Sequence, residues 1–545
     1  MRFIYLLLFL SFVFGLNAES SQRYKFRVYL KDKGNTDYSV DEPEKFLSPK
    51  SIERKGRQNV LVDETDFPLS TDYFIQMSQS GAEVVSHSKW FKTMVVQLND
   101  SSQIETIGNL SFVDSVKYVW KGFEQNRMET IRPRLSLTDC IDTSEIENLY
   151  GISEAQFVMH NALGLHRSGF TGKGINIGVI DAGFTNVDVI PYFVSNNLVE
   201  YKSFVPGGNV LADSDHGTKV FSTISAVVPG KMMGSASASN FYLLHSEDVS
   251  TEFPVEEDYW VRAVEYADSA GVDLINSSLG YSDFDDKQLS YSHADLDGLT
   301  SIMSQAADMA FDKGMIVVAS AGNEGSKPWR KISVPGDAVK AFTVGAVGTD
   351  SLIASFSSMG FTADGRLKPD VVSVGRGTIT IGKDGRIEPS NGTSFSSPFM
   401  TGLIASLWSI NPELHRSELL DIVKESGDRF HCPDSVYGNG IPDIGNAMKK
   451  VLKTLRPYSG PYEDNLFSAG KMIDDSIEIT LNDQKFSSGV YTITLLNGDG
   501  NVVLRQPFSD EGKSLLPVAG LAENNDYFYM VVNAPHRQKT VRFKL

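Results

Sequence analysis

Cysteine is rare in this chain. Its 545 residues include only Cys140 and Cys432, so at most one intramolecular disulfide can form and a disulfide-stapled framework is excluded. If the chain is exported, the oxidising compartment permits these two thiols to pair. The alternative is two unpaired buried thiols, and the sequence leaves both readings open.

Basic residues are also fewer than acidic ones. The chain has 50 Lys and Arg residues against 68 Asp and Glu residues, which gives a formal net charge of −18. Binding to nucleic acid needs clustered basic side chains that displace phosphate counterions, so we expect no nucleic-acid partner. A hydrophobic content of 41% with 22% charged residues is ordinary for folded proteins, and the length allows roughly three domains.

Long apolar runs are missing after the first twenty residues, so we expect no transmembrane segment. The N-terminus reads MRFIYLLLFLSFVFGLNAES, with Arg2 before a short apolar run and small residues near Ala18. This pattern predicts a signal peptide over residues 1–18 and a secreted protein. The run is short for a membrane anchor, which is the alternative.

The rest of the chain divides into three blocks. Residues 19–130 mix strands such as YKFRVYL with two helices, which predicts a small α+β unit. In residues 131–456, six short apolar runs alternate with amphipathic helices, which predicts an α/β fold with a doubly wound parallel sheet. Residues 460–545 contain short strands and the turn signal NGDGN at 497–501, which predicts a small β-sandwich.

Polar side chains stand at the ends of the predicted central strands, where parallel sheets gather functional groups. Asp181 follows INIGVI, Asn323 follows MIVVAS, His216 opens an amphipathic helix, and Ser394 lies at the mouth of another in SNGTSFSSPFM. Taken singly, each residue also fits a capping, turn or structural role. Gly217 after the histidine would allow a close backbone approach.

In the order Asp181, His216, Asn323, Ser394, the chain resembles the subtilisin-like serine peptidases. The matching segments are GVIDAGF, DHGTKVFSTI, NSSLG, VVASAGNEG, LKPDVV and NGTSFSSPFMTG. The block before them resembles the inhibitory propeptides of secreted bacterial members. The resemblance therefore implies a zymogen that cuts itself between about Lys121 and Tyr150 and carries its propeptide as an intramolecular inhibitor.

The resemblance also implies catalytic roles. Ser394 would be the nucleophile, His216 its general base, and Asp181 the group that orients the imidazole. The Asn323 amide and the Ser394 backbone N–H would hold the oxyanion. Ser396 and Ser397 are then helix-start residues. Pro398 is expected in the first helical turn, where spare N–H groups tolerate proline.

Substrate binding follows from the same resemblance. Ser278, Leu279 and Gly280 would form an exposed strand edge on which an extended peptide pairs through its main chain, so the expected substrates are polypeptides. Two residues depart from the family pattern, because Ala182 replaces a usual Ser or Thr and Lys219 replaces a common second histidine. The last block resembles the sorting domains of type IX secretion only faintly, and an accessory domain is the alternative.

The predicted mechanism needs no cofactor and no metal. An acid-rich stretch, YSDFDDKQLSYSHADLDG, invites a calcium hypothesis because calcium prefers oxygen ligands. Its spacing does not match an EF-hand loop, so a solvated loop is the favoured interpretation and calcium stays open.

The sequence suggests two alternatives to a secreted, monomeric serine endopeptidase. A catalytically silent peptide-binding relative would keep the fold, although such a protein has no need of all four catalytic positions. An α/β-hydrolase needs a Gly-x-Ser-x-Gly elbow and its serine first in the triad order. Here Ser396 takes the place of the second glycine and the serine comes last, which excludes this class.

Overall fold

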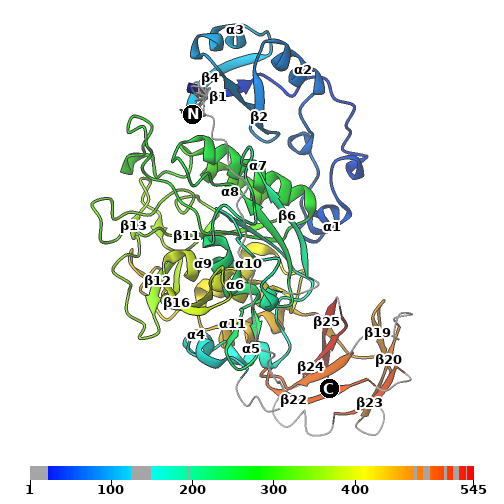
Figure 1. Cartoon of the computed structure of the whole chain (residues 1–545). Helices are drawn as coiled ribbons and strands as arrows, with labels where there is room; N and C mark the ends of the chain where they lie inside the picture. Colours follow the sequence, from blue (N-terminus) through cyan, green and yellow to red (C-terminus); the bar gives the residue numbers. More distant parts are fainter. Residues whose placement is uncertain are drawn as a thin grey trace, which may run out of the picture.

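The structure is a computed structural model that describes residues 22–123, 149–193, 197–470, 476–482, 491–508, 512–518, 527–535 and 537–544. It consists of an N-terminal part, a central part and a C-terminal part, which follow one another down the molecule (Figure 1). The predicted signal peptide lies outside the described residues. Among the helices of those ranges, none combines the length and the hydropathy needed to cross a bilayer.

The N-terminal part is built on a four-stranded antiparallel sheet in the order β2-β3-β1-β4. The apolar side chains Val28, Met94 and Val96 point from it to Met77 and Ile107 on the two helices that cover it. The elements are β1 (Gln22–Leu30), α2 (Thr71–Gln79), β2 (Glu83–Ser88), β3 (Thr93–Leu98), α3 (Ile104–Gly108) and β4 (Val113–Phe123).

Helix α1 (Pro49–Arg57) is present as the sequence predicts, but it does not belong to this small sandwich. It lies against the central part, next to the C-terminal end of α7 (Val255–Ala270) (Figure 1). The guanidinium of Arg54 is fully buried there and donates to the carbonyls of Asp268 and Val272. Helix C-termini leave carbonyls without intrahelical partners, and this arginine binds one such group, that of Asp268, together with the carbonyl of Val272 just beyond the helix.

The central part contains an eight-stranded sheet in the order β16-β15-β12-β11-β10-β5-β9-β6. Every neighbouring pair is parallel except β15 and β16, which are antiparallel. All six predicted strands are present. The strands are β5 (Asn176–Asp181), β6 (Leu198–Ser203), β9 (Asn240–His245), β10 (Leu274–Ser277), β11 (Ile316–Ser320), β12 (Phe342–Gly348), β15 (Val371–Ile381) and β16 (Ile387–Asn391).

The sequence did not predict β6 and β16, because both are edge strands that lack a buried apolar run. In β6, exposed and half-buried residues alternate, and β16 contains Pro389. Proline is tolerated at a sheet edge because its missing N–H breaks no ladder there.

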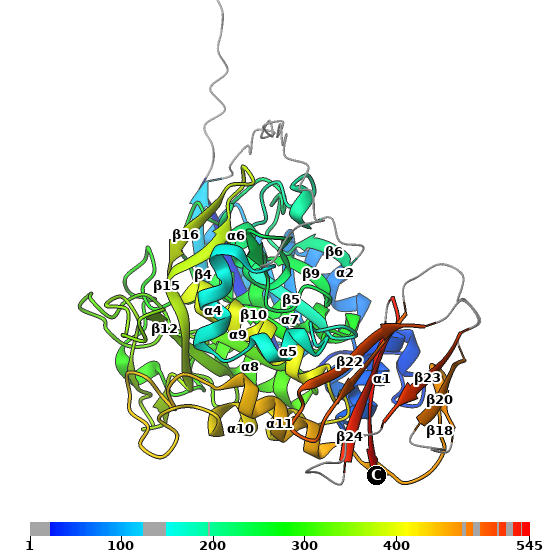
Figure 2. The same ribbon diagram turned by 90° about the horizontal axis from the view of Figure 1, so that it is seen from below.

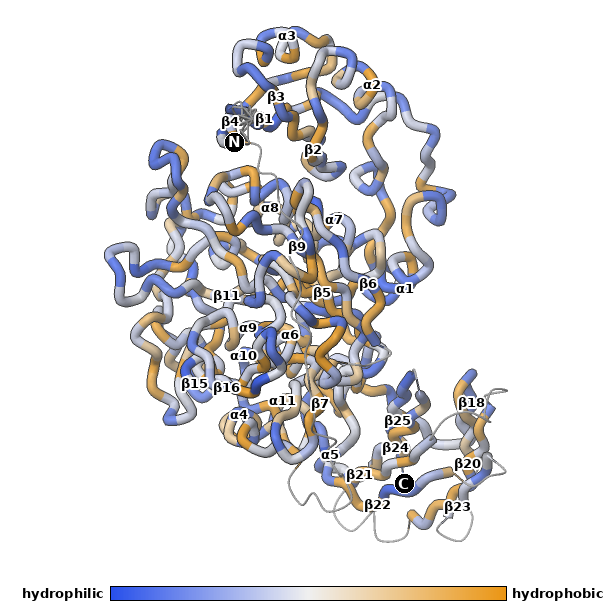
Figure 3. Tube along the Cα trace, viewed as in Figure 1, coloured by the Kyte–Doolittle hydropathy of each residue, from blue (hydrophilic) through white to orange (hydrophobic). Residues whose placement is uncertain are grey.

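Helices cover both faces of this sheet, which confirms the doubly wound prediction. Successive residues of β10 face opposite ways, so Leu274 belongs to the core under one set of helices and Ile275 to the core under the other. Figure 3 accordingly colours much of β5 as hydrophobic. One face carries α6 (His216–Ser225), α9 (Thr393–Trp408) and α11 (Ile444–Thr454), and the other carries α7 and α8 (Ile302–Asp312).

The C-terminal part is a sandwich of two sheets with an apolar core between them. It packs beside α5 (Leu163–Arg167), where Arg505 donates to the carbonyl of Arg167 (Figure 2). The turn at 497–501 joins two antiparallel strands as predicted. The strands are β17 (Pro457–Tyr458), β18 (Tyr462–Glu463), β19 (Phe467–Ala469), β20 (Ser476–Leu481), β21 (Thr492–Leu496), β22 (Val502–Pro507), β23 (Lys513–Pro517), β24 (Tyr527–Asn533) and β25 (Gln538–Lys544).

Candidate active site

A cavity of about 370 Å³ opens at the carboxyl ends of the central strands. The side chains of His216, Asn323 and Ser394 line it, together with the segment 278–280. Asp181 is fully buried at the end of β5 and lies behind the histidine. The structure therefore brings all of the predicted site residues to one edge of the sheet.

Asp181 and His216 form a tight pair, with 2.7 Å between Oδ1 and Nδ1. Burial lowers the pKa of the imidazole, but the charge and the hydrogen bond of Asp181 raise it more, and the result is a pKa of about 9. The same carboxylate oxygen accepts from the Ala182 backbone N–H at 2.8 Å. Its Oδ2 has no hydrogen-bond partner among the described residues, and the departure from Ser or Thr at position 182 leaves no hydroxyl beside it.

Gly217 allows this pair to form. A Cβ atom at this position would lie 2.3 Å from the carbonyl oxygen of Gly183, a distance that no side chain tolerates. Glycine therefore lets the first turn of α6 approach the loop after β5, as the sequence predicted. That approach puts the imidazole within reach of the carboxylate.

Ser394 is the second residue of α9 and lines the same cavity as the imidazole. Its hydroxyl donates to the carbonyl of Ser278 at 3.4 Å, and no hydrogen bond joins it to His216 within the described part of the chain. In structures without substrate, catalytic hydrogen bonds are often long or unformed.

The other hydroxyls at the start of α9 hold the local structure. Ser396 donates to the carbonyl of Thr393, and Ser397 donates to the amide oxygen of Asn276. Ser396 lies in the first turn of the helix as predicted, whereas Ser397 is its fifth residue and binds Asn276 of β10.

Pro398 requires a correction. It is the sixth residue of α9, so it lies beyond the first turn and deprives the Ser394 carbonyl of its intrahelical partner. The hydroxyl of Ser278 replaces that partner and donates to the carbonyl at 2.9 Å. The proline thus ties the serine at position 394 to the segment 278–280.

Asn323 is oriented by the residue next to the serine. Its Oδ1 accepts from the backbone N–H of Thr393 at 2.9 Å and from the hydroxyl of Thr393 at 3.1 Å. Because the amide oxygen is occupied in this way, the Nδ2 group remains as a donor on a side chain that lines the cavity. A fixed N–H donor beside a hydroxyl is what an oxyanion site requires.

The segment 278–280 lines the cavity but is not the exposed strand edge that the sequence predicted. Strand β10 ends at Ser277, and the side chains of Ser278 and Leu279 are buried. Only Gly280 is exposed. The segment lies beyond the sheet ladder because its contacts go to the start of α9 and to Ser333, near position 280.

Three acidic residues in or beside the cavity were not predicted. Glu247 and Glu252 line it, and carboxylate oxygens of these two residues and of Glu256 lie within 4.8 Å of one another. The rule that functional groups gather at the carboxyl ends of parallel strands could have found Glu247, because it follows β9 after a single serine.

The acid-rich loop at 281–298 uses its carboxylates locally. Asp283 binds Lys287 and Ser290, Asp295 caps its own turn, and Asp297 accepts from the backbone N–H groups of 299 and 300. Cys432 is exposed, whereas Cys140 lies outside the described residues, so their pairing stays a prediction.

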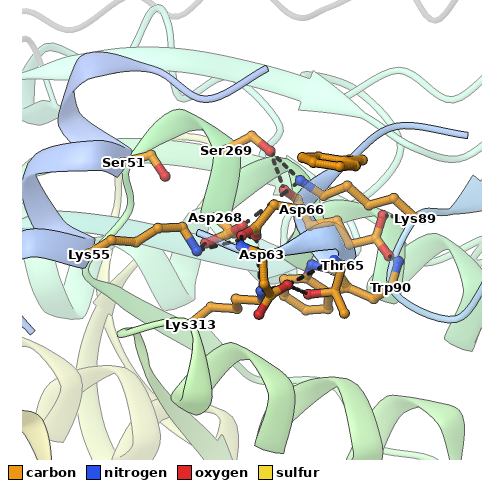
Figure 4. Close-up of polar contacts among 12 residues, drawn as sticks. Ser51, Lys55, Asp63, Thr65, Asp66, Lys89, Trp90, Asp268, Ser269 and Lys313 are labelled. Atoms are coloured by element: carbon orange, nitrogen blue, oxygen red, sulfur yellow. Dashed lines mark hydrogen bonds and ion pairs between the residues drawn. The ribbon is translucent and has the colours of Figure 1, made fainter. Parts of the chain in front are cut away.

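The N-terminal part meets the central part through buried charges (Figure 4). Asp268 of α7 is fully buried and lies 2.5 Å from Arg54, 3.5 Å from Lys55 and 3.9 Å from Lys89. Burial raises the pKa of this carboxyl, but the cations around it lower the pKa further, and its net shift is downward. The interface therefore supplies cations to an acid that could not otherwise ionise in the interior.

Ser394, His216 and Asn323 line one cavity, and Asp181 pairs with the histidine, so the site holds the kinds of group that a serine hydrolase uses. The comparisons with known proteins agree. Residues 172–440 match the subtilase family, and residues 25–133 match the peptidase S8 propeptide domain of Bacteroidota. The chain belongs to the subtilase family and is a serine endopeptidase with an N-terminal propeptide domain.

Individual proteins are similar to this chain as well. Subtilisin NAT of Bacillus subtilis subsp. natto is 28% identical over 310 residues, which cover 55% of this chain and 71% of that protein. A subtilisin of Bacillus pumilus is 29% identical over 306 residues, covering 55% of this chain and 98% of the relative. The crystal structure of the epidermin leader peptide processing serine protease of Staphylococcus aureus matches with a TM-score of 0.53 at 17% sequence identity. The match covers 78% of this chain and 98% of that protein, and it supports the fold.

Proposed function

We propose that this protein is a secreted endopeptidase that cuts polypeptides with Ser394 as nucleophile and is made as a self-processed zymogen. The observation that carries the proposal is the Asp181–His216 pair at 2.7 Å in one site with Ser394 and the Asn323 amide. The proposed reaction uses side chains and backbone groups alone and needs no cofactor.

His216 acts as the general base. It takes the proton from the Ser394 hydroxyl as oxygen attacks the substrate carbonyl, and later gives that proton to the leaving amine. Asp181 holds the imidazole by Nδ1 and stabilises its charged form through the same contact that raises its pKa. For the attack, the hydroxyl turns from the carbonyl of Ser278 toward Nε2 of a neutral imidazole.

The tetrahedral intermediate places a negative charge on the former carbonyl oxygen. The Asn323 Nδ2 group and the backbone N–H of Ser394 are the donors we assign to that charge. The latter N–H lies in the first turn of α9, where backbone donors lack intrahelical acceptors. In a subtilisin, loss of one such donor costs about 10²–10³ in kcat.

The propeptide domain is proposed to inhibit the enzyme until it is cut away. Buried pairs such as Arg54–Asp268 and Arg27–Asp258, the latter at 2.6 Å, would keep it attached after the first cleavage. Cleavage is expected between about Lys121 and Tyr150, and before Cys140 if this residue pairs with Cys432 in the mature enzyme. Export through residues 1–18 and a monomeric mature form complete the proposal.

A fluorophosphonate probe tests the nucleophile. After propeptide removal, the wild-type protein should be labelled and Ser394→Ala should not, while Ser396→Ala serves as the matched control and keeps its label. N-terminal sequencing of the processed protein locates the cut, and Ser394→Ala should remain full length. A wild type that stays unlabelled after confirmed propeptide removal would favour a catalytically silent peptide-binding relative.

A further inference from the structure

The cavity with Ser394 and His216 has an acidic wall. Glu247 and Glu252 line it, and Glu256 lies behind them with its carboxylate fully buried. The same cavity has to receive the substrate under the proposed function. Whatever side chain enters this region therefore meets two carboxylates at the mouth and a third beneath them.

Among the described residues, the opposite charge that acts on this cluster is the His216 imidazole, which lowers the pKa of Glu247. Within the described ranges, no lysine or arginine forms an ion pair with Glu247, Glu252 or Glu256, although the chain pairs most of its other buried carboxylates. Burial and neighbouring acids raise the pKa of Glu247 to about 8 and that of Glu252 to about 7. Buried like charges are unfavourable when no ion pair offsets them, so a cation that enters the cavity would stabilise the charged form of these acids.

The acidic wall is held by the fold. Glu256 accepts from the backbone N–H of Phe253 at 3.0 Å and from the hydroxyl of Tyr281 at 3.3 Å. The backbone N–H of Glu252 donates to Asp285 at 3.1 Å. These contacts occupy Glu256 and fix the chain around Glu252, while the carboxylates of Glu247 and Glu252 accept no hydrogen bond from any described residue.

We propose that Glu247 and Glu252 form a subsite for a lysine or arginine side chain of the polypeptide substrate, with Glu256 and Tyr281 as its buried support. The inference rests on the proposed function, because it takes this cavity as the place where the peptide binds. A long basic side chain suits the arrangement, since its aliphatic stem can cross the cavity while its charge reaches the two carboxylates.

The sequence of the chain itself supplies candidates for such a side chain. The stretch between about Lys121 and Tyr150, in which self-cleavage is expected, contains Arg127, Arg132 and Arg134. A subsite for basic residues would direct the first cut close to one of these arginines. The mature N-terminus should then fall within a few residues of the stretch 127–134.

Peptide hydrolysis by the mature enzyme tests the subsite. Fluorogenic peptides that differ at one position near the scissile bond, with Arg, Lys, Met or Glu there, should show at least a tenfold higher kcat/KM for Arg and Lys at one position. The double variant Glu247→Gln/Glu252→Gln should lose that preference and still cut the Met peptide. Asp286→Asn, which removes an acid outside the cavity, is the matched control and should keep the preference.

Each outcome decides the proposal. Equal rates for basic and neutral peptides, or a preference that survives in the double variant, would overturn it. A preference that appears only with added calcium and vanishes with a chelator would reassign the cluster to a metal ion and also overturn it. If the wild type cuts no peptide at all, the proposed function fails instead. If the double variant does not fold, the single Glu252→Gln variant should still reduce the preference.

Discussion

Helix α7 borders two sets of acidic residues that the protein treats in opposite ways. Along the helix, Asp258 and Asp268 are buried against arginines and lysines of the propeptide domain. At its N-terminal end, Glu256 forms a cluster with Glu247 and Glu252 that has no such partner in the described chain. The paired acids hold two parts of the protein together, and the unpaired acids face the cavity where we expect the substrate.

The difference shows in the effect of burial on the two sets. Cations outweigh burial at Asp268, whose pKa falls, whereas burial and like charges raise the pKa of all three acids in the cluster. Pairing is not complete along the helix, since burial still raises the pKa of Asp258 despite Arg27. The propeptide interface therefore carries an electrostatic cost that matching cations reduce, and the cavity carries a cost that a ligand could reduce.

The largest expected effect comes from breaking a paired acid. Arg54→Met leaves Asp268 with more distant cations and removes the donor to the carbonyls of Asp268, in the last turn of α7, and of Val272, just beyond it. Removing one partner of a buried pair typically costs about 3–5 kcal/mol, which corresponds to two or more orders of magnitude in affinity. Inhibition of peptide hydrolysis by the added propeptide measures this loss, and an unchanged inhibition constant would contradict the assigned role.

The unpaired acids predict that the folded protein becomes less stable as the pH rises. A carboxyl group whose folded-state pKa is raised stabilises the fold fully below its unfolded pKa, and this contribution is lost as pH rises through the folded value. For Glu252 and Glu247 the loss accumulates above the ordinary range of a glutamate and is complete once the pH has passed about 7 and about 8, respectively. In the inactive Ser394→Ala background, melting temperatures between pH 6 and 9 should fall, by the equivalent of at least about 1.4 kcal/mol.

The variant Glu247→Gln/Glu252→Gln in the same background is the control for this effect. Its melting temperature should fall less than that of the parent across that range, because neutral amides do not ionise and only the loss due to the raised pKa of His216 remains. Equal slopes for both proteins would show that other groups cause the loss.

Glu247 also connects the cluster with catalysis. Asp181 is the main cause of the raised pKa of His216, and Glu247 adds to it. The imidazole must be neutral to act as a base, so activity should rise with pH toward about 9. Glu247→Gln should move this rise to lower pH by a fraction of a unit in the pH profile of kcat/KM. A shift to higher pH would contradict the contribution assigned to Glu247.

The smallest effect is expected from an exposed pair in the acid-rich loop. Lys287 and Asp283 lie 2.7 Å apart, but their side chains are 70% and 65% exposed. Such pairs contribute about 0–1 kcal/mol, so Lys287→Ala should leave the melting temperature almost unchanged. A clear loss would show that exposure is a poor guide to the value of ion pairs here.

Much of the fold could be predicted because its signals are local. Six buried strands appear as short apolar runs, and Gly314 after α8 has the positive φ that a C-terminal cap requires. The edge strands β6 and β16 could not be predicted, because an edge needs no continuous apolar run. Pro398 was predicted in the first turn of the helix but lies in the second. The sequence alone does not show that the helix begins directly after Gly392.

The candidate site was predicted in part. Asp181, His216, Asn323 and Ser394 stand out because their positions after strands and before helices carry chemical meaning, and the order of all four matches a family. Glu247 and Glu252 did not stand out, because nothing in a sequence shows that an acid faces a cavity without a cation. The exposure of Ser278 and Leu279 was wrong for the same reason, since burial depends on what packs against the chain.

By itself, the sequence determined the class of fold, the family and the residues able to carry out the chemistry, because periodicity and motif order are properties of neighbouring positions. The tertiary structure alone decided which acids found cations. Arg54 and Asp268 are separated by 214 positions, and Glu247 lies 147 positions before the serine whose cavity it lines. Charges interact through space, so only the folded chain shows which acids pair with cations of the propeptide domain and which lie unpaired at the proposed substrate cavity.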